Sequence, residues 1–243
     1  MRKYSPVLNL GRFRFELRPV ATAAMAVAVA LFAALGNWQL ERSAEKRMLD
    51  EDFTRMGAAL PLPPASITVP RYQRVIAAGH YDTSHQFLLD NMSESGSAGV
   101  HVLTPLLLAD DNAVLVDRGW APFGVTRDSL PDVAVGSAVR EVTGRMDQLP
   151  RPSIRLAAAP AEAWPRLTSF PEMHELASQL GRGLHPQLIL LDPQEPDGFV
   201  RNWQVPGTTS VRHLGYAIQW FAFAVTAVAI WIALGLSRSG EPG

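Results

Sequence analysis

The sequence predicts a membrane protein with two transmembrane helices, one near each end, that flank an α+β, sheet-rich extracytoplasmic domain. Two uncharged runs, residues 19–40 and 214–237, predict the helices. The domain is predicted from residues 41–212, where alternating apolar and polar stretches typical of strands are separated by turn-forming residues. The sheet of this domain is either open or closed into a barrel-like form.

The first apolar run, residues 19–40, is long enough for a helix to cross the ~30 Å hydrocarbon core of a bilayer. Trp38 lies at its end, and an aromatic residue there is typical of the membrane–water interface, which favours an uncleaved helix. Because Arg12, Arg14 and Arg18 precede the run, a cleaved signal peptide is the alternative.

Charges around the first run predict the orientation. Basic residues outnumber the single acid, Glu16, before that run, so the positive-inside rule places the N-terminus in the cytoplasm. A second crossing returns the C-terminal tail to the same side. The domain then faces the periplasm of a bacterium, whose inner (plasma) membrane holds the chain, or the intermembrane space of a mitochondrion. The expected parts are a cytoplasmic segment at 1–18, transmembrane helices at 19–40 and 213–236, the extracytoplasmic domain at 41–212, and a cytoplasmic tail at 237–243.

The domain contains six candidate strands and one candidate helix. Asp110–Asn112 is a good hairpin turn, whereas residues 93–99 predict a loop. The helix covers residues 171–180, with Ser169 as its cap and Gly181 where it stops. The proline-rich residues 60–70 predict an extended spacer, and 150–155 predict another break. The candidate strands are 71–79, 85–91, 100–108, 113–118, 139–146 and 188–191, with a turn at 80–84.

Composition excludes several classes of function. The 22 basic and 23 acidic side chains nearly cancel, so the chain has no broad attraction for nucleic acid, and we expect no such partner. The chain contains no cysteine, which excludes disulfides, iron–sulfur clusters, thiolate zinc sites and a cysteine nucleophile.

Catalytic motifs are missing from the sequence, so we expect no enzyme. It has no G-x-S-x-G nucleophile elbow, no phosphate-binding Gly-Lys loop and no zincin His pair. His80 and His85 lie in a predicted turn, where solvation is favoured over metal binding. Asp110 and Asp111 lie at a predicted hairpin tip, where water keeps both ionised, and catalytic carboxylate pairs need a pocket that separates their pKa values.

Four clusters are candidates for function. In residues 36–46, Trp38 and Arg42 share a helical face, as do Arg42 and Lys46. The segments 103–105 (LTP) and 117–122 (DRGWAP) belong to the predicted hairpin, where core packing is the alternative. The last cluster places His213, Tyr216 and Trp220 at i, i+3 and i+7 of the second helix. A His there is suited to ligate haem iron or bind a propionate, and an ordinary interfacial aromatic belt is the alternative.

These clusters resemble, in order, the motifs of the surfeit locus protein 1 family. GNWQLERSAEK is similar to the family signature G-x-W-Q-x-x-R-x-x-x-K, and YQRVIAAGHYD, VLTPLLL, VLVDRGWAP and HLGYAIQWF match further motifs. One departure is Asp117, where the family normally has Asn.

The resemblance implies an assembly factor for haem–copper cytochrome c oxidase that acts on the large catalytic subunit at haem a insertion. The implied cofactor is transiently bound haem a, with His213 as iron ligand, and haem a synthase is a further implied partner beside the lipid bilayer. Tyr216 and Trp220 would form walls, and Arg42 and Lys46 would pair with the propionates. Trp38, Gln39, Arg118 and Trp120 are the expected interaction residues, while Ala26, Ala30 and Ala34 would allow the helices to approach closely.

Two alternatives remain at this point. The protein is a cofactor-free scaffold or chaperone for an oxidase subunit, with Arg118 and Trp120 on a contact surface and His213 in an aromatic belt. The weaker alternative is a membrane-anchored periplasmic hydrolase.

Overall fold

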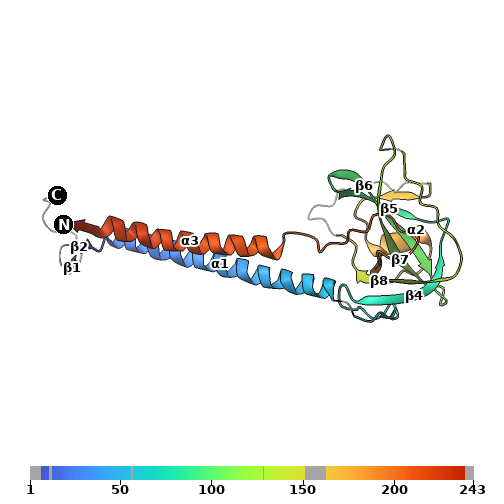
Figure 1. The fold of residues 1–243 in the computed structure, drawn as a ribbon, viewed down its shortest axis with the longest axis horizontal. Helices are drawn as coiled ribbons and strands as arrows, with labels where there is room; N and C mark the ends of the chain where they lie inside the picture. Colours follow the sequence, from blue (N-terminus) through green and yellow to red (C-terminus); the bar gives the residue numbers. More distant parts are fainter. Residues whose placement is uncertain (1–6, 11–12, 56, 128, 151–162, 239–243) are drawn as a thin grey trace. The chain divides into compact units, whose positions relative to one another are not determined.

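A computed structural model describes the chain except residues 1–6, 11–12, 56, 128, 151–162 and 239–243 (Figure 1). The chain divides into two compact units. Residues 1–51 and 205–243 form a helical unit, and residues 52–204 form a sheet-rich unit. The expected break at 150–155 lies almost wholly outside the described residues.

The helical unit contains two long helices, α1 (Pro19–Thr54) and α3 (Ser210–Gly235). Both are long and apolar enough to cross a membrane, as predicted. Helix α1 continues well past the apolar run because residues 41–54 are rich in strong helix formers and contain neither Gly nor Pro.

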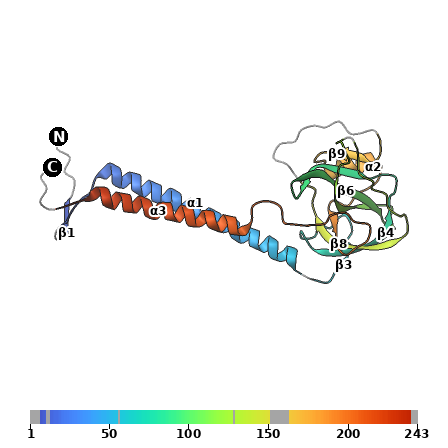
Figure 2. The same cartoon turned by 45° about the horizontal axis from the view of Figure 1, so that its top comes forward.

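The two helices pack side by side and antiparallel, as Figures 1 and 2 both show. Near one end, Trp231 Nε1 donates a hydrogen bond to Thr22 Oγ1 at 3.0 Å. Further along the helices, the Phe32 and Trp220 rings stack with their centroids 5.8 Å apart. Buried or half-buried residues of α1 recur at spacings of three and four, which keeps them in a seam on one helix face. The seam comprises Thr22, Met25, Val29, Phe32, Gly36, Gln39, Ser43 and Lys46 of α1, and Ser210, His213, Ala217, Trp220, Ala224 and Trp231 of α3, all buried or half-buried.

The expectation that Ala26, Ala30 and Ala34 bring the helices together is wrong, because all three are exposed. A constant spacing of four advances roughly 40° around a helix at each step, so such a row drifts off the seam. Gly36 makes the close approach instead. A Cβ added there would lie 2.8 Å from the Phe221 ring.

A small antiparallel sheet lies at the end of the helix pair where α1 begins and α3 ends, next to the Trp231–Thr22 contact. It contains β1 (Val7–Leu10), β2 (Phe13–Glu16) and β11 (Leu236–Arg238), with β2 in the middle. Phe15 packs edge-on against Trp231, with ring centroids 4.9 Å apart. The sequence did not predict these strands.

The second unit is built on an eight-stranded sheet in the order β3-β4-β8-β10-β7-β6-β5-β9. Strand β4 also pairs with β6 through His80 and Tyr81, so five strands curl round until they meet at one corner. Because β5 and β9 continue the sheet beyond that corner, it is not a clean barrel. The strands are β3 (Leu60–Pro61), β4 (Arg74–Tyr81), β5 (Phe87–Glu94), β6 (Ser97–Leu107), β7 (Ala113–Pro122), β8 (Arg140–Asp147), β9 (Arg166–Thr168) and β10 (Leu188–Leu191).

All six predicted strands are confirmed; β10 has the predicted ends and the other five have shifted ends. The predicted loop at 93–99 is wrong, since β5 and β6 form a hairpin with only Ser95 and Gly96 between them. Both residues have positive φ, 49° and 82°, as tight two-residue hairpin turns require. The predicted turn at 80–84 starts too early, because His80 and Tyr81 belong to β4, and the spacer at 60–70 contains the short β3.

The single helix of this unit, α2 (Met173–Leu180), is confirmed, but its cap is not Ser169. Glu172 is the N-cap and forms a capping box with Glu175. Gly181 ends the helix with φ 68°, as predicted.

Apolar side chains from the sheet form the core of this unit. Strand β7 is buried along nearly its whole length because it lies between β10 and β6. The main buried cluster comprises Val75, Ala77, Tyr81, Leu106, Val114, Val116, Val142, Met146, Ile189 and Leu191.

Candidate functional site

The candidate site lies on the helical unit, where Gln39 of α1 meets His213 of α3; we call it the Gln39–His213 junction. The His213 Nδ1 and Gln39 Oε1 atoms are 2.7 Å apart. An amide oxygen only accepts hydrogen bonds, so the imidazole must donate from Nδ1. A neutral His213 then carries its lone pair on Nε2, which has no hydrogen-bond partner among the described residues.

Further hydrogen bonds hold the first turn of α3 against α1 beside this pair. Ser43 Oγ donates to the Ser210 carbonyl at 2.9 Å, and Lys46 Nζ donates to the Pro206 carbonyl. Thr209 caps α3, its hydroxyl accepting from the backbone of Arg212. The backbone that carries His213 is therefore fixed relative to Gln39.

One side of the junction is aromatic and basic. Trp38 and Tyr216 are 48% and 46% exposed, and the Arg42 guanidinium lies 6.0 Å from the Trp38 ring centroid. With roughly 100° of rotation per residue and an antiparallel pair, helical geometry places Trp38, Arg42 and Tyr216 on the same side of the seam. Arg212, which the sequence analysis did not single out, is exposed on that side as well.

The sequence-predicted residues are thus partly brought together. Lys46 lies on the seam and is engaged by the Pro206 carbonyl, while Arg42 pairs with Glu45 at 2.7 Å. Trp220 lies two turns deeper, roughly 10 Å along α3 from His213, where it stacks on Phe32. The junction itself combines an imidazole, two exposed aromatic rings and nearby cations.

Two expected interaction residues, Arg118 and Trp120, are buried in the sheet-rich unit, with 2% and 8% of their surface exposed. They do not form a contact surface there, and core packing, the alternative reading, describes both. Trp120 packs on Gly99, where an added Cβ would lie 2.6 Å from the indole ring.

Arg118 links two loops to the sheet. Its Nε donates to the Asp197 carbonyl at 2.7 Å, and its Nη1 donates to the Val133 carbonyl at 2.9 Å. The same Nη1 reaches Thr104 and Gln86 at 3.4 and 3.2 Å, which joins the LTP and DRGWAP segments in one polar cluster. Burial lowers the pKa of Arg118.

Asp117 pairs with His101 on the neighbouring strand, with Oδ2 2.8 Å from Nδ1. Burial lowers the pKa of His101, but the charge and hydrogen bond of Asp117 raise it by more, with a further contribution from Glu94. The Trp203 ring lies 5.6 Å from the imidazole.

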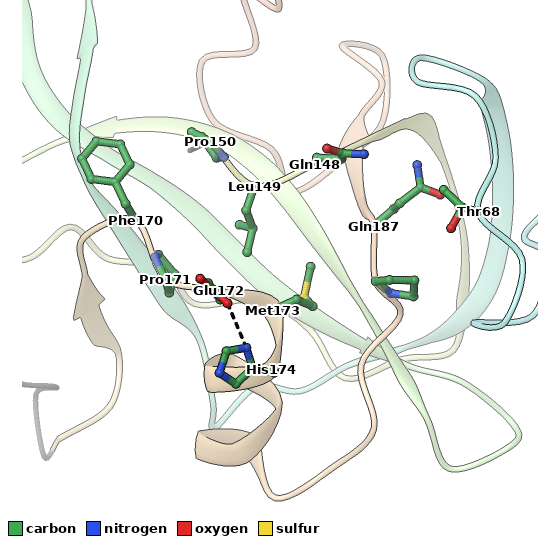
Figure 3. Close-up of a pocket in the computed structure, with 11 residues that line it drawn as sticks. Thr68, Gln148, Leu149, Pro150, Phe170, Pro171, Glu172, Met173, His174 and Gln187 are labelled. Atoms are coloured by element: carbon green, nitrogen blue, oxygen red, sulfur yellow. Dashed lines mark ion pairs between the residues drawn. The ribbon is translucent and has the colours of Figure 1, made fainter. Parts of the chain in front are cut away.

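A cavity of about 650 Å³ on the sheet-rich unit has Glu172 and His174 on its rim (Figure 3). His174 Nδ1 lies 3.1 Å from Glu172 Oε2, and the side chains of Glu172 and His174 are 60% and 75% exposed, so water solvates both groups. Among the described residues, no group of three or more His, Asp or Glu is placed to hold a metal ion. His85 contacts Asp82 at 2.8 Å, and Asp110 accepts from Asn112 within the hairpin turn, which lowers the pKa of Asp110.

Comparisons with known proteins cover nearly the whole chain. The model of the SURF1 family matches residues 26–225. A SURF1-like protein of Monosiga brevicollis is 28% identical, covering 90% of this chain and 89% of that protein. Surfeit locus protein 1 of Takifugu rubripes is 23% identical, covering 82% and 90%, and a SURF1-like protein of Rickettsia conorii is 23% identical, covering 83% and 85%.

Proposed function

This chain belongs to the SURF1 family, and we propose that it assists assembly of haem–copper cytochrome c oxidase by presenting haem a at the Gln39–His213 junction. The observation that carries the proposal is the hydrogen bond from His213 Nδ1 to Gln39 Oε1. Metal-ligating histidines usually donate their other ring N–H to a fixed acceptor, which leaves a lone pair for the metal. His213 has this arrangement on a helix long and apolar enough to cross a membrane.

The residues around the junction fit a haem. Trp38 and Tyr216 offer exposed aromatic surface for the macrocycle, and Arg42 and Arg212 offer guanidinium groups for propionates. The helix dipole adds a partial positive charge at the start of α3, near the same place. Bound haem would supply an iron centre that accepts the His213 nitrogen.

The chain's part in delivery is to bind, orient and release. His213 would hold the iron from one helix, and Trp38 and Tyr216 would cover apolar surface of the haem that water would otherwise meet. About half of the surface of each residue remains exposed, so the site lies on an open side of the helix pair, from which a cargo can leave without the helices separating.

We further propose that both helices cross the inner membrane of a bacterium, with both termini in the cytoplasm and residues 52–204 in the periplasm. The positive-inside balance of residues 1–18 supports this orientation. The catalytic subunit of the oxidase is then the receiving partner, and haem a synthase is the donor.

The test is to co-express the full chain with haem a synthesis, purify it in detergent and measure haem content and visible spectrum. We expect bound haem a in the native protein and its loss in His213→Ala. His174→Ala is the matched control, because His174 is an exposed histidine of the other unit. Native protein without haem, together with an oxidase defect on gene deletion, would favour a cofactor-free scaffold instead.

A further inference from the structure

We propose that Gln39 is a positioning residue that holds His213 as the Nδ1–H tautomer and so keeps Nε2 available to a metal. This inference rests on the proposed function, because the metal in question is the haem iron. It assigns to Gln39 a role inside the site, whereas the sequence suggested only an interaction residue.

The proton position of His213 follows from the geometry. A histidine without a fixed acceptor at Nδ1 carries its proton mainly on Nε2, the nitrogen that metals usually need. Gln39 Oε1, 2.7 Å from Nδ1, reverses this preference because the carbonyl oxygen can only accept. The unprotonated Nε2 is then present before any ligand arrives.

Gln39 is well placed to impose this choice. Its side chain is only 9% exposed and lies on the seam, so its position is determined by helix packing. One turn earlier, Gly36 lets the Phe221 ring approach to contact, which keeps α1 and α3 close enough for Gln39 to reach His213. The Ser43–Ser210 hydrogen bond fixes the turn on the other side.

Gln39 has two distinguishable roles, a packing contact between the helices and the positioning of the His213 imidazole. Polar side chains between apolar helices also stabilise packing, and Ser43 makes a similar interhelical hydrogen bond one turn away without contacting His213. If Gln39 were only such a contact, removal of either side chain would have the same consequence for His213. Positioning predicts that only Gln39 controls the tautomer.

The experiment compares the full-length native protein with Gln39→Met, Gln39→Glu and Ser43→Ala in detergent. Nitrogen-15 NMR of the haem-free proteins reports which ring nitrogen of His213 is protonated, with His213→Ala identifying the signals. We expect Nδ1–H in the native protein, in Gln39→Glu and in Ser43→Ala. In Gln39→Met, which keeps length but lacks an acceptor, we expect the proton on Nε2.

Haem affinity is the second measurement on the same proteins. Loss of an outer acceptor typically lowers metal affinity by about 10–100-fold, so Gln39→Met should fall in that range while Ser43→Ala stays near native. Gln39→Glu should retain haem with an altered spectrum, because a carboxylate makes the imidazole a stronger donor. Nε2–H in the native protein, or unchanged tautomer and affinity in Gln39→Met, would overturn the inference without touching haem binding. Native protein that binds no haem would overturn the proposed function instead.

Discussion

Replacing Arg118 by Met should destabilise the sheet-rich unit more than any surface substitution. The guanidinium donates to the Asp197 and Val133 carbonyls at 2.7 and 2.9 Å, and both acceptors belong to loops that Met cannot hold. Hydrogen bonds to charged groups contribute about 1.5–3 kcal/mol each. The two short bonds therefore contribute about 3–6 kcal/mol.

The net loss is smaller because the substitution also relieves the cost of burying a charge. We expect a net destabilisation of about 3 kcal/mol. A domain of this size shifts by about 2–4 °C in Tm per kcal/mol, so the expected fall is roughly 6–12 °C.

Near-ultraviolet circular dichroism and tryptophan fluorescence on the full chain would follow the thermal transition. Arg182→Met is the matched control, since Arg182 pairs with Asp111, whose side chain is 91% exposed, and should cost less than about 1 kcal/mol. An equal Tm for the Arg118 variant and this control would refute the reasoning.

Three further results are expected. Gly36→Leu forces a side chain into the Phe221 ring and should separate the helices, which spin labels on introduced cysteines would detect, because the chain has no cysteine of its own. Arg42→Gln should weaken haem binding several-fold and make the remaining affinity less salt-dependent, as titration at two salt concentrations would measure. The folded-state pKa of His101 is raised, so the His101–Asp117 ion pair stabilises fully below the ordinary histidine value and is lost as pH rises through the raised one. Asp117→Asn should therefore flatten the change in Tm between about pH 6 and pH 8.

Two of these predictions have a matched control variant. Ala34→Leu adds the same side chain to an exposed position of α1 and should leave the helices together. His80→Gln removes an exposed histidine and should leave the pH dependence of Tm intact. The helix-packing argument would be contradicted by equal spin-label distances in Gly36→Leu and the native protein. The charge argument would be contradicted if the loss of haem affinity in Arg42→Gln were the same at both salt concentrations. The ion-pair argument would be contradicted if Asp117→Asn left the pH dependence of Tm unchanged.

The elements that local sequence determines were predictable. The length of the two runs without charged residues predicts both long helices, and alternation of apolar and polar residues predicts the six main strands. Both patterns can be recognised from neighbouring residues alone. The pairing of β4 with β6 and the short β9 depend on contacts between distant segments, which no local pattern encodes. Ser95–Gly96 was missed because polar residues of an edge hairpin look like those of a loop.

The candidate site was predictable one helix at a time. The residues of α3 and the basic residues of α1 followed from helical spacing, but the partner of His213 depends on which face of α1 packs inward. A usable signal was present in Gly36, Gln39 and Ser43, whose spacing of three and four continues the seam that carries Phe32. The row Ala26, Ala30 and Ala34 led to a wrong prediction of the packed face, because its constant spacing of four does not match the alternating spacing of three and four.

The polar contacts at the two ends of the seam prevent the helices from sliding past one another. Trp231 bonds Thr22 at one end and His213 bonds Gln39 at the other, with apolar residues between. A slip of one heptad, roughly 10 Å, would break both contacts at once and bury unsatisfied polar groups in an apolar interface. The two helices therefore keep one fixed register, which holds His213 at a constant distance from the Trp231–Thr22 end of the helix pair.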